Sequence, residues 1–309
     1  MKKFLTFCIC LILTLFVIDD KFLDGNIYSN IDNSFNKKTY NIISNVNALN
    51  KSPYLNKDFS SYAKTTTNFY PKNKEDLLNI YYTILNNGWD NFSYYCDSSY
   101  TSCLDDINNL SKDSNVFSSI NQLVHPYNSF KTIQSNYNSN GRIDVTIEKK
   151  YSNEDIVKIN NKINNIINEL NINNYTNVLD KIKVFHDYIA NNNKYDKDKL
   201  SGNSKYNSDS AIGTLFEGYS ICSGYTDTLA IFLSKIGIDN VRVANNSHTW
   251  NALLINNEWK HIDLTWDDPI TTNNSDVIIY DYYLISSKDI TKKNEKEHYY
   301  SINVYNFLK

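Results

Sequence analysis

The sequence predicts an α+β protein with two folded parts, on the basis of three observations. Its 309 residues are enough for two domains of roughly 100–200 residues each. The hydrophobic pattern changes from mixed helix and strand to regular helix near Ser152, and a β-hairpin is predicted further along, over residues 248–264. With 41% apolar and 14% aromatic residues, the chain can build a core and lies outside the disordered class.

The charge balance excludes one large class of partners. The chain carries 31 Lys and Arg against 34 Asp and Glu, a net charge of −3. A chain without a basic excess has no electrostatic footprint for nucleic acid, so we expect none as a partner. Arginine occurs only twice, at Arg142 and Arg242, while asparagine and tyrosine are abundant. We therefore give little weight to Asn, Lys and Tyr as functional signals.

Residues 1–20 are typical of a signal peptide or an N-terminal membrane anchor. Lys2 and Lys3 precede an unbroken apolar run over residues 4–18, which two aspartates follow. Such a run is short for a membrane span but suits the core of a signal peptide, and no small-residue cleavage site follows it. We expect an exported protein, secreted or anchored to the outer face of the membrane or cell wall. Contact with the membrane is expected only through this segment.

The cysteines beyond this leader are Cys96, Cys103 and Cys222. An exported protein can form disulfides, and Cys96 and Cys103 are close enough in sequence to close a small loop. Their spacing matches no common zinc pattern, so no metal site is expected. Cys222 is then left over, either as a buried apolar residue or as a reactive thiol.

Residues 21–70 are polar and show no sustained periodicity, which predicts a linker. The next stretch, 71–151, is predicted to form a small α/β domain of unknown role. Apolar residues from Leu77 to Leu85 recur at helical spacing, and His125 is interpreted as structural. Strands are predicted over 89–95, 129–137 and 142–151, with a turn at Asn140-Gly141 between the last two.

The remaining part, 152–309, is predicted to be the catalytic domain. An apolar stripe from Ile156 to Leu170 predicts a helix, with Asp155 placed for a capping box. A second helix is predicted after Thr176, and residues 190–210 are predicted to be a polar loop.

Cys222 is predicted to lie in the first turn of a long, mostly buried helix. Gly218 interrupts the preceding structure, and an apolar helical pattern continues from Cys222 to Gly237. Free backbone N–H groups and the positive end of the helix dipole favour a thiolate at such a position. The same N–H groups can stabilise an oxyanion.

A hairpin follows, with Asn256-Asn257 as its predicted two-residue turn. In that register, residues whose numbers sum to 513 lie opposite each other, so Asp263 faces Trp250 and His248 lies two residues further along the same face. Diagonal neighbours about 7 Å apart allow a carboxylate to reach an imidazole. The pattern predicts that Asp263 orients His248, that His248 takes the thiol proton, and that Cys222 attacks an acyl carbon.

Two other interpretations of these residues are weighed against this one. His248 and Asp263 can be ordinary polar groups at strand ends, but three residues in complementary positions favour the triad. His261 lies on the same face as His248, yet it pairs near Ala252, deeper in the hairpin. We therefore prefer His248 as the base.

Two segments, GYSICSGYTDTL and SHTWNALLINNEWKHIDLTWDDP, resemble the transglutaminase-like superfamily of papain-like thiol enzymes, most closely exported proteins of low-GC Gram-positive bacteria. The resemblance extends over roughly 152–290. It implies a core of helices packed on an antiparallel sheet, with the cysteine at a helix N-terminus, and Cys222, His248 and Asp263 as the triad. HDYI and YDYYLIS resemble flanking segments, and His186, Asp187 and Tyr188 are taken as structural. No upstream Gln offers a second oxyanion donor, a role that Tyr219 or Ser220 could fill.

These features favour acyl transfer through a thioester on Cys222. With water as acceptor the protein is a cysteine peptidase or amidase acting on surface or cell-wall peptides, which we prefer for an exported enzyme. With a lysine amine as acceptor it is a cross-linking protein-glutamine transferase, and exclusion of water would decide between the two. A third possibility is a catalytically idle module that binds the wall or a partner. No nucleotide loop, paired-glycine fingerprint or calcium loop is present, so no cofactor is expected.

Overall fold

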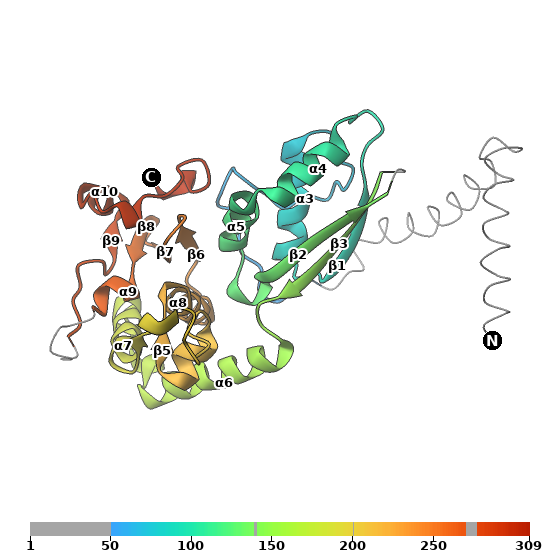
Figure 1. The fold of residues 1–309 in the computed structure, drawn as a ribbon. Coiled ribbons are helices and arrows are strands. Elements are labelled where there is room, and N and C mark those ends of the chain that lie inside the picture. The colour runs from blue at the N-terminus through green and yellow to red at the C-terminus, as the bar shows by residue number, and fades with distance from the viewer. Residues whose placement is uncertain (1–50, 139–140, 200, 270–276) are drawn as a thin grey trace, which may run out of the picture. The chain divides into compact units, whose positions relative to one another are not determined.

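The computed structural model describes residues 51–138, 141–199, 201–269 and 277–309, which belong to one compact unit (Figure 1). The predicted leader, residues 1–20, and the first part of the predicted linker lie outside the described residues. Within the described ranges, no helix is both long and apolar enough to cross a membrane.

The predicted linker is wrong for residues 51–70, which pack into the folded unit. Ala63 and Phe69 are 1% and 2% exposed, and the ring of Phe69 lies 4.8 Å from that of Phe92. The hydroxyl of Ser60 donates to the carbonyl of Val304 at 2.5 Å. This stretch is held by single apolar residues and side-chain hydrogen bonds, which produce no periodic pattern in the sequence.

The first folded part combines three helices with a three-stranded antiparallel sheet of order β1-β3-β2. The helix and the three strands predicted here are confirmed, whereas α4 and α5 were not predicted, because both are short and rich in polar residues. Gly141, at the predicted turn, has a φ of +77°. The elements are α3 (Lys74–Asn86), β1 (Asn91–Tyr95), α4 (Cys103–Lys112), α5 (Ser114–Leu123), the 3₁₀ turn η2 (Pro126–Asn128), β2 (Phe130–Tyr137) and β3 (Arg142–Lys149).

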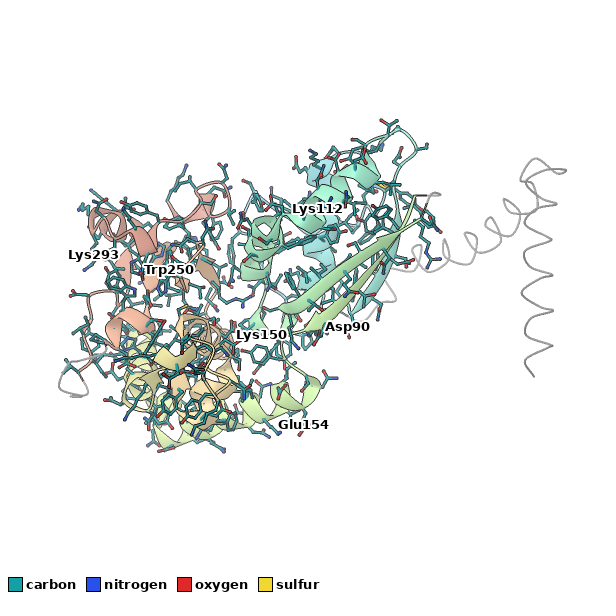
Figure 2. All side chains as sticks on the ribbon, in the orientation of Figure 1. Asp90, Lys112, Lys150, Glu154, Trp250 and Lys293 are labelled. Atoms are coloured by element: carbon teal, nitrogen blue, oxygen red, sulfur yellow. A yellow bond between two sulfur atoms is a disulfide. The ribbon has the colours of Figure 1, made fainter. Side chains whose placement is uncertain are left out.

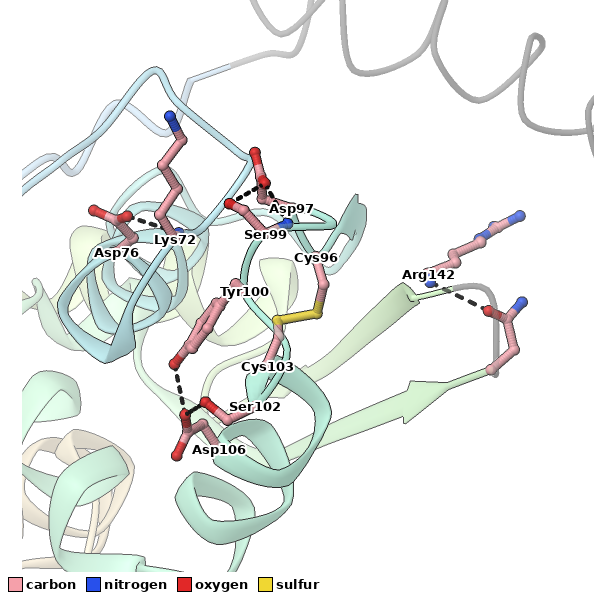
Figure 3. Close-up of a disulfide and its surroundings, with 11 residues drawn as sticks. Lys72, Asp76, Cys96, Asp97, Ser99, Tyr100, Ser102, Cys103, Asp106 and Arg142 are labelled. Carbon is pink, nitrogen blue, oxygen red and sulfur yellow. Dashed lines mark hydrogen bonds between the residues drawn. A yellow bond between two sulfur atoms is a disulfide. The ribbon is translucent and has the colours of Figure 1, made fainter.

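Cys96 and Cys103 form a disulfide, a pairing that their spacing in the sequence allowed but left open (Figure 3). The bond joins the residue after β1 to the first residue of α4. Nearby, the carboxylate of Asp106 accepts hydrogen bonds from the hydroxyls of Tyr100 at 2.7 Å and Ser102 at 2.9 Å. The disulfide and this carboxylate together fix the loop between strand and helix.

The second part is built on a four-stranded antiparallel sheet of order β6-β7-β8-β9, with α8 packed against β6 and β7. Ser152 and Asp155 form the predicted capping box of α6. The helices are α6 (Asn153–Glu169), α7 (Val178–Asn191), α8 (Cys222–Lys235), α9 (Leu264–Asp267) and α10 (Ser287–Lys292). The strands are β4 (Lys194–Tyr195), β5 (Tyr219–Ser220), β6 (Asn240–Ala244), β7 (Thr249–Ile255), β8 (Glu258–Ile262) and β9 (Ile285–Ser286). Short turns are η3 (Ile172–Asn174), η4 (Lys197–Lys199), the π-helical η5 (Gly213–Glu217), η6 (Lys296–His298) and η7 (Asn306–Leu308).

The core of this second part lies between its helices and its sheet. Phe185 of α7 and Phe232 of α8 stack with ring centroids 3.8 Å apart, and both are fully buried. Leu253 of β7 and Ile262 of β8 close the same cluster from the sheet. The predicted α+β class, with helices packed on an antiparallel sheet and Cys222 at a helix N-terminus, is confirmed.

A buried ionic cluster joins the two parts across the boundary predicted at residue 151. The carboxylate of Asp227 in α8 binds Lys150 at 2.6 Å and Arg242 at 2.7 Å. Arg242 also donates to the hydroxyl of Ser129 at 2.6 Å, in the first part. Burial raises the pKa of Asp227, but the charges of Lys150 and Arg242 outweigh it and lower this pKa to about 2. The side chains that surround Lys150 are shown in Figure 2.

Replacing Arg242 by Met is expected to lower the free energy of unfolding by about 3 kcal/mol. The buried carboxylate of Asp227 would lose the positive charge of Arg242, and the hydroxyl of Ser129 would lose its donor. Urea unfolding of both proteins measures the difference. Arg142→Met is the matched control, because the ion pair of Arg142 with Asp144 is only partly buried and should contribute less than about 1 kcal/mol. Equal losses in the two variants would contradict a special role for the buried arginine.

Candidate active site

Cys222 is the first residue of α8, as predicted, and it is a free, half-buried thiol. Ile221, which precedes the helix, has no side-chain oxygen to cap the N–H groups of the first turn. Gly224 packs so closely that an added Cβ would lie 2.3 Å from the carbonyl oxygen of Ser208. The first turn of the helix, which begins with Cys222, is therefore held against residue 208.

The hairpin that carries His248 and Asp263 has the predicted register. Asn251 pairs with Ile262, and Asn256 and Asn257 both have positive φ, as a type I′ turn requires. His248 directly precedes β7 and Asp263 directly follows β8, so both lie at one end of the hairpin. Nε2 of His248 and Oδ2 of Asp263 are 2.5 Å apart, and both residues are buried.

His248 lies between Asp263 and Cys222. Burial by itself lowers the pKa of His248, but the charge of Asp263 and hydrogen bonds to Asp263 and Cys222 outweigh it and raise this pKa to about 10. Burial raises the pKa of Asp263, yet the charge and hydrogen bond of His248 lower it to about 2. At neutral pH the imidazole is therefore positively charged, and the carboxylate of Asp263 is its hydrogen-bonded counter-charge.

Asp263 accepts hydrogen bonds at both carboxylate oxygens. Oδ1 accepts from the backbone N–H groups of Thr265 at 3.0 Å and Trp266 at 3.4 Å, which makes Asp263 the N-cap of α9. Oδ2 accepts from His248 and also lies 2.8 Å from Nε2 of His298. His298 could not be predicted from the sequence, because it lies 35 residues beyond Asp263 in a polar segment without a motif.

The other histidines have different partners. Nδ1 of His261 accepts from the indole N–H of Trp250 at 3.0 Å, and burial lowers the pKa of His261 to about 3. His261 pairs with Ala252, as predicted, and Asp263 contacts His248 instead. His186 is fully buried between Asp187 and Asp267, at 3.0 and 3.2 Å. These contacts agree with the structural roles expected for His186 and Asp187.

The two residues suggested as oxyanion donors differ in placement. Ser220 is fully buried and its hydroxyl lies 2.6 Å from that of Thr214, so the suggestion of a side-chain donor at Ser220 is wrong. The ring of Tyr219 is half-buried and stacks on that of Tyr206, with centroids 3.9 Å apart. The hydroxyls of Ser220 and Thr214 both pack against Gly224 in the first turn of α8.

Tyr195 is a further candidate that the sequence analysis did not find. It lies on β4, paired in parallel with Ser220 of β5, and is half-buried. Burial, followed by the negative charge of Cys222, raises the pKa of Tyr195. Its phenol therefore stays protonated at neutral pH and can act as a hydrogen-bond donor. Tyr195 is linked to the site by the pairing of β4 with β5, which ends two residues before Cys222.

Within the described residues, one cluster has the composition of a metal site. Nitrogen or oxygen atoms of His248, Asp263 and His298 all lie within 4.8 Å of one another. Both imidazoles, however, direct Nε2 at the same carboxylate oxygen, at hydrogen-bonding distance. Hydrogen bonds account for this arrangement, whereas a metal would need both nitrogens deprotonated.

No family model matches this chain, and no curated protein matches its sequence. Among solved structures, a transglutaminase is similar over 55% of this chain and 50% of its own, with 17% identity and a TM-score of 0.35. A candidate cysteine protease from Cytophaga hutchinsonii is similar over 48% of this chain and 65% of its own, with 15% identity and a TM-score of 0.28. Neither likeness is close enough to assign the chemistry of this chain, for which the hydrogen bonds around His248 are the stronger argument.

Proposed function

We propose that the protein is a transglutaminase-like thiol enzyme that transfers an acyl group through a thioester on Cys222. The single observation that supports this most is the position of His248. Its imidazole is hydrogen-bonded to Asp263 at 2.5 Å, and Cys222, at the N-terminus of α8, is near enough to contribute to the raised pKa of His248. An imidazole held by a carboxylate and facing a thiol is the arrangement that nucleophilic catalysis by cysteine requires.

In the proposed reaction, the Cys222 thiolate attacks the carbonyl carbon of an amide and forms a tetrahedral intermediate. His248 then gives its proton to the leaving amine, the C–N bond breaks, and a thioester remains on the sulfur. Water gives a proton to His248 and attacks the thioester, which releases a carboxylic acid and restores the thiolate–imidazolium pair. The backbone N–H groups of the first turn of α8, together with the Tyr195 hydroxyl, stabilise the oxyanion.

We propose hydrolysis of surface or cell-wall peptides by an exported enzyme. The Cys96–Cys103 disulfide supports export, because such bonds persist in oxidising compartments. A hollow of about 720 Å³ is lined by Ser247, the residue before His248, and supports a substrate of polar chemistry. Its lining is mostly serine and asparagine, with Lys296 and the tyrosines Tyr62, Tyr299 and Tyr305.

Alkylation of the purified protein by iodoacetamide across pH 4–9, with Cys222 followed by mass spectrometry, tests the proposal. We expect Cys222 to react well below the ordinary thiol range near pH 8.5, and its rate at pH 6 to fall about 100-fold in His248→Ala. His261→Ala is the matched control and should leave the rate unchanged. Reaction only near pH 8.5, or the same loss in both variants, would refute the proposed activation.

The acyl acceptor is tested on peptides in H₂¹⁸O, with and without a primary amine. Hydrolysis incorporates ¹⁸O into the new carboxylate, whereas transfer gives a product that carries the amine. If the product that carries the amine predominates when both acceptors are present, the enzyme is a transferase and the proposal of a hydrolase is wrong. It would leave the role of Cys222 intact.

Tyr195→Phe is expected to lower turnover of such a peptide about 100-fold, because it removes one hydrogen bond to the oxyanion. Alkylation of Cys222 by iodoacetamide forms no oxyanion, so its rate should change little. Comparison of the two rates in one preparation therefore separates loss of the oxyanion donor from general damage. Parallel losses in both reactions would contradict this role of Tyr195.

A further inference from the structure

His298 contacts the same carboxylate oxygen of Asp263 as His248 does, and the proposed reaction does not use this second contact. Its Nε2 lies 2.8 Å from Oδ2 of Asp263, the same oxygen that lies 2.5 Å from Nε2 of His248. Both histidines are buried, and their rings meet edge to face with centroids 5.5 Å apart. One carboxylate oxygen thus accepts two imidazole N–H groups from different directions, which restricts its rotation.

The ring of His298 is enclosed by aromatic side chains. Tyr282 stacks on it with centroids 4.3 Å apart, and Trp250 and Trp266 meet it at steep angles, each at 5.1 Å. The His298 residue is 3% exposed. This packing fixes the orientation of the ring and therefore the direction in which its Nε2 points.

Within the described part of the chain, Nδ1 of His298 is buried without a hydrogen-bond partner. A buried polar atom without a partner is unfavourable, and a phenylalanine would fill the same aromatic surroundings without that penalty. Packing alone therefore does not account for a histidine here. The hydrogen bond from Nε2 to Asp263 does account for it.

Asn245 joins the segment that carries His298 to the loop that carries His248. Its Oδ1 accepts from the backbone N–H of His248 at 2.9 Å. Its Nδ2 donates to the carbonyls of Glu297 at 2.7 Å and Tyr299 at 2.9 Å, the two residues that flank His298. The two histidines are thus held together through a backbone connection as well as through Asp263.

We propose that His298 is a positioning residue, which holds the carboxylate of Asp263 in the orientation that directs His248 at Cys222. The inference rests on the proposed thiol chemistry, in which His298 touches neither the substrate nor the sulfur. Its Nε2–H acts on Oδ2 of Asp263, and Asp263 in turn acts on His248. The C-terminal segment is accordingly part of the active site.

A matched pair of variants separates this role from packing. His298→Gln keeps an amide N–H at about the reach of Nε2, whereas His298→Met has a similar length and no donor. In the full-length protein we expect the alkylation rate of Cys222 at pH 6 to fall about 10-fold in His298→Met and to recover in His298→Gln. Iodoacetamide is the probe, and circular dichroism gives the folded fraction to which each rate is normalised.

His298→Phe, which preserves the ring, serves as a second donor-free variant if the Met variant does not fold. Equal rates in the Gln variant and either donor-free variant would overturn the inference. So would a wild-type rate in His298→Phe. Failure of the proposed function gives a different result. In that case Cys222 of the wild type is itself no more reactive than an ordinary thiol.

Discussion

Asp263→Ala is expected to reduce turnover of a peptide substrate by about 10⁴-fold, because the base loses the group that orients it and stabilises its charge. The same change is expected to lower the free energy of unfolding by about 3–5 kcal/mol, since it leaves a buried imidazolium without its counter-charge. Two partly buried backbone N–H groups at the start of α9 lose their acceptor as well. Steady-state rates and urea unfolding measure the two effects.

Asp263→Asn separates these two effects. An asparagine can still accept from the N–H groups of Thr265 and Trp266, so it should retain more of the stability at the start of α9. It cannot supply the negative charge, and we expect activity to remain low. A fully active Asn variant would show that the charge of Asp263 is not required.

The pH dependence of stability should show the His248–Asp263 pair directly. The pKa of His248 is raised to about 10 by Asp263 and Cys222, so its contribution is fully present below its unfolded pKa of about 6.5 and is lost as the pH rises toward 10. The pKa of Asp263 is lowered to about 2, so its contribution is present above about 3.9 and is lost as the pH falls toward 2. The pair is therefore expected to stabilise the protein most between about pH 4 and 6.5.

Urea unfolding at pH 5.5, 8 and 9.5 tests this dependence in wild type and in His248→Gln. We expect the free energy of unfolding of the wild type to fall over this range and the difference between the two proteins to shrink as the pH rises. The pKa of His186 is raised as well, so it also contributes to the pH dependence. Its contribution is the same in the wild type and in His248→Gln and therefore cancels in the difference between them. A constant difference from pH 5.5 to 9.5 would mean that His248 does not carry the proton assigned to it.

The parts of the site that the sequence predicted are those that local rules determine. Cys222 starts a helix because a glycine interruption precedes an apolar helical pattern, and the structure begins α8 at that residue. The paired asparagines 256 and 257 fixed the hairpin register, since each adopts a positive φ. That register brought His248 and Asp263 together without knowledge of the rest of the fold.

The parts that the sequence did not predict depend on long-range packing. His298 and Tyr195 reach the site through a polar segment and a two-residue strand, neither of which has a periodic pattern. Residues 51–70 lack a period as well, and they pack through scattered residues such as Phe69. No rule based on neighbours in sequence can place such residues, because their partners lie tens of residues away.

The contact of Ser60 with Val304 joins the two ends of the described unit. These residues are 244 positions apart, so closing this contact has a high entropic cost and depends on prior folding of the sequence between them. His298, the last residue of η6, lies on the same C-terminal segment as Val304, and its hydrogen bond to Asp263 spans 35 residues. Cys222, His248 and Asp263 can therefore be brought together by local structure alone, whereas the hold of His298 on the carboxylate also requires this segment to dock. Local opening of the segment would be expected to release the carboxylate before the rest of the unit unfolds.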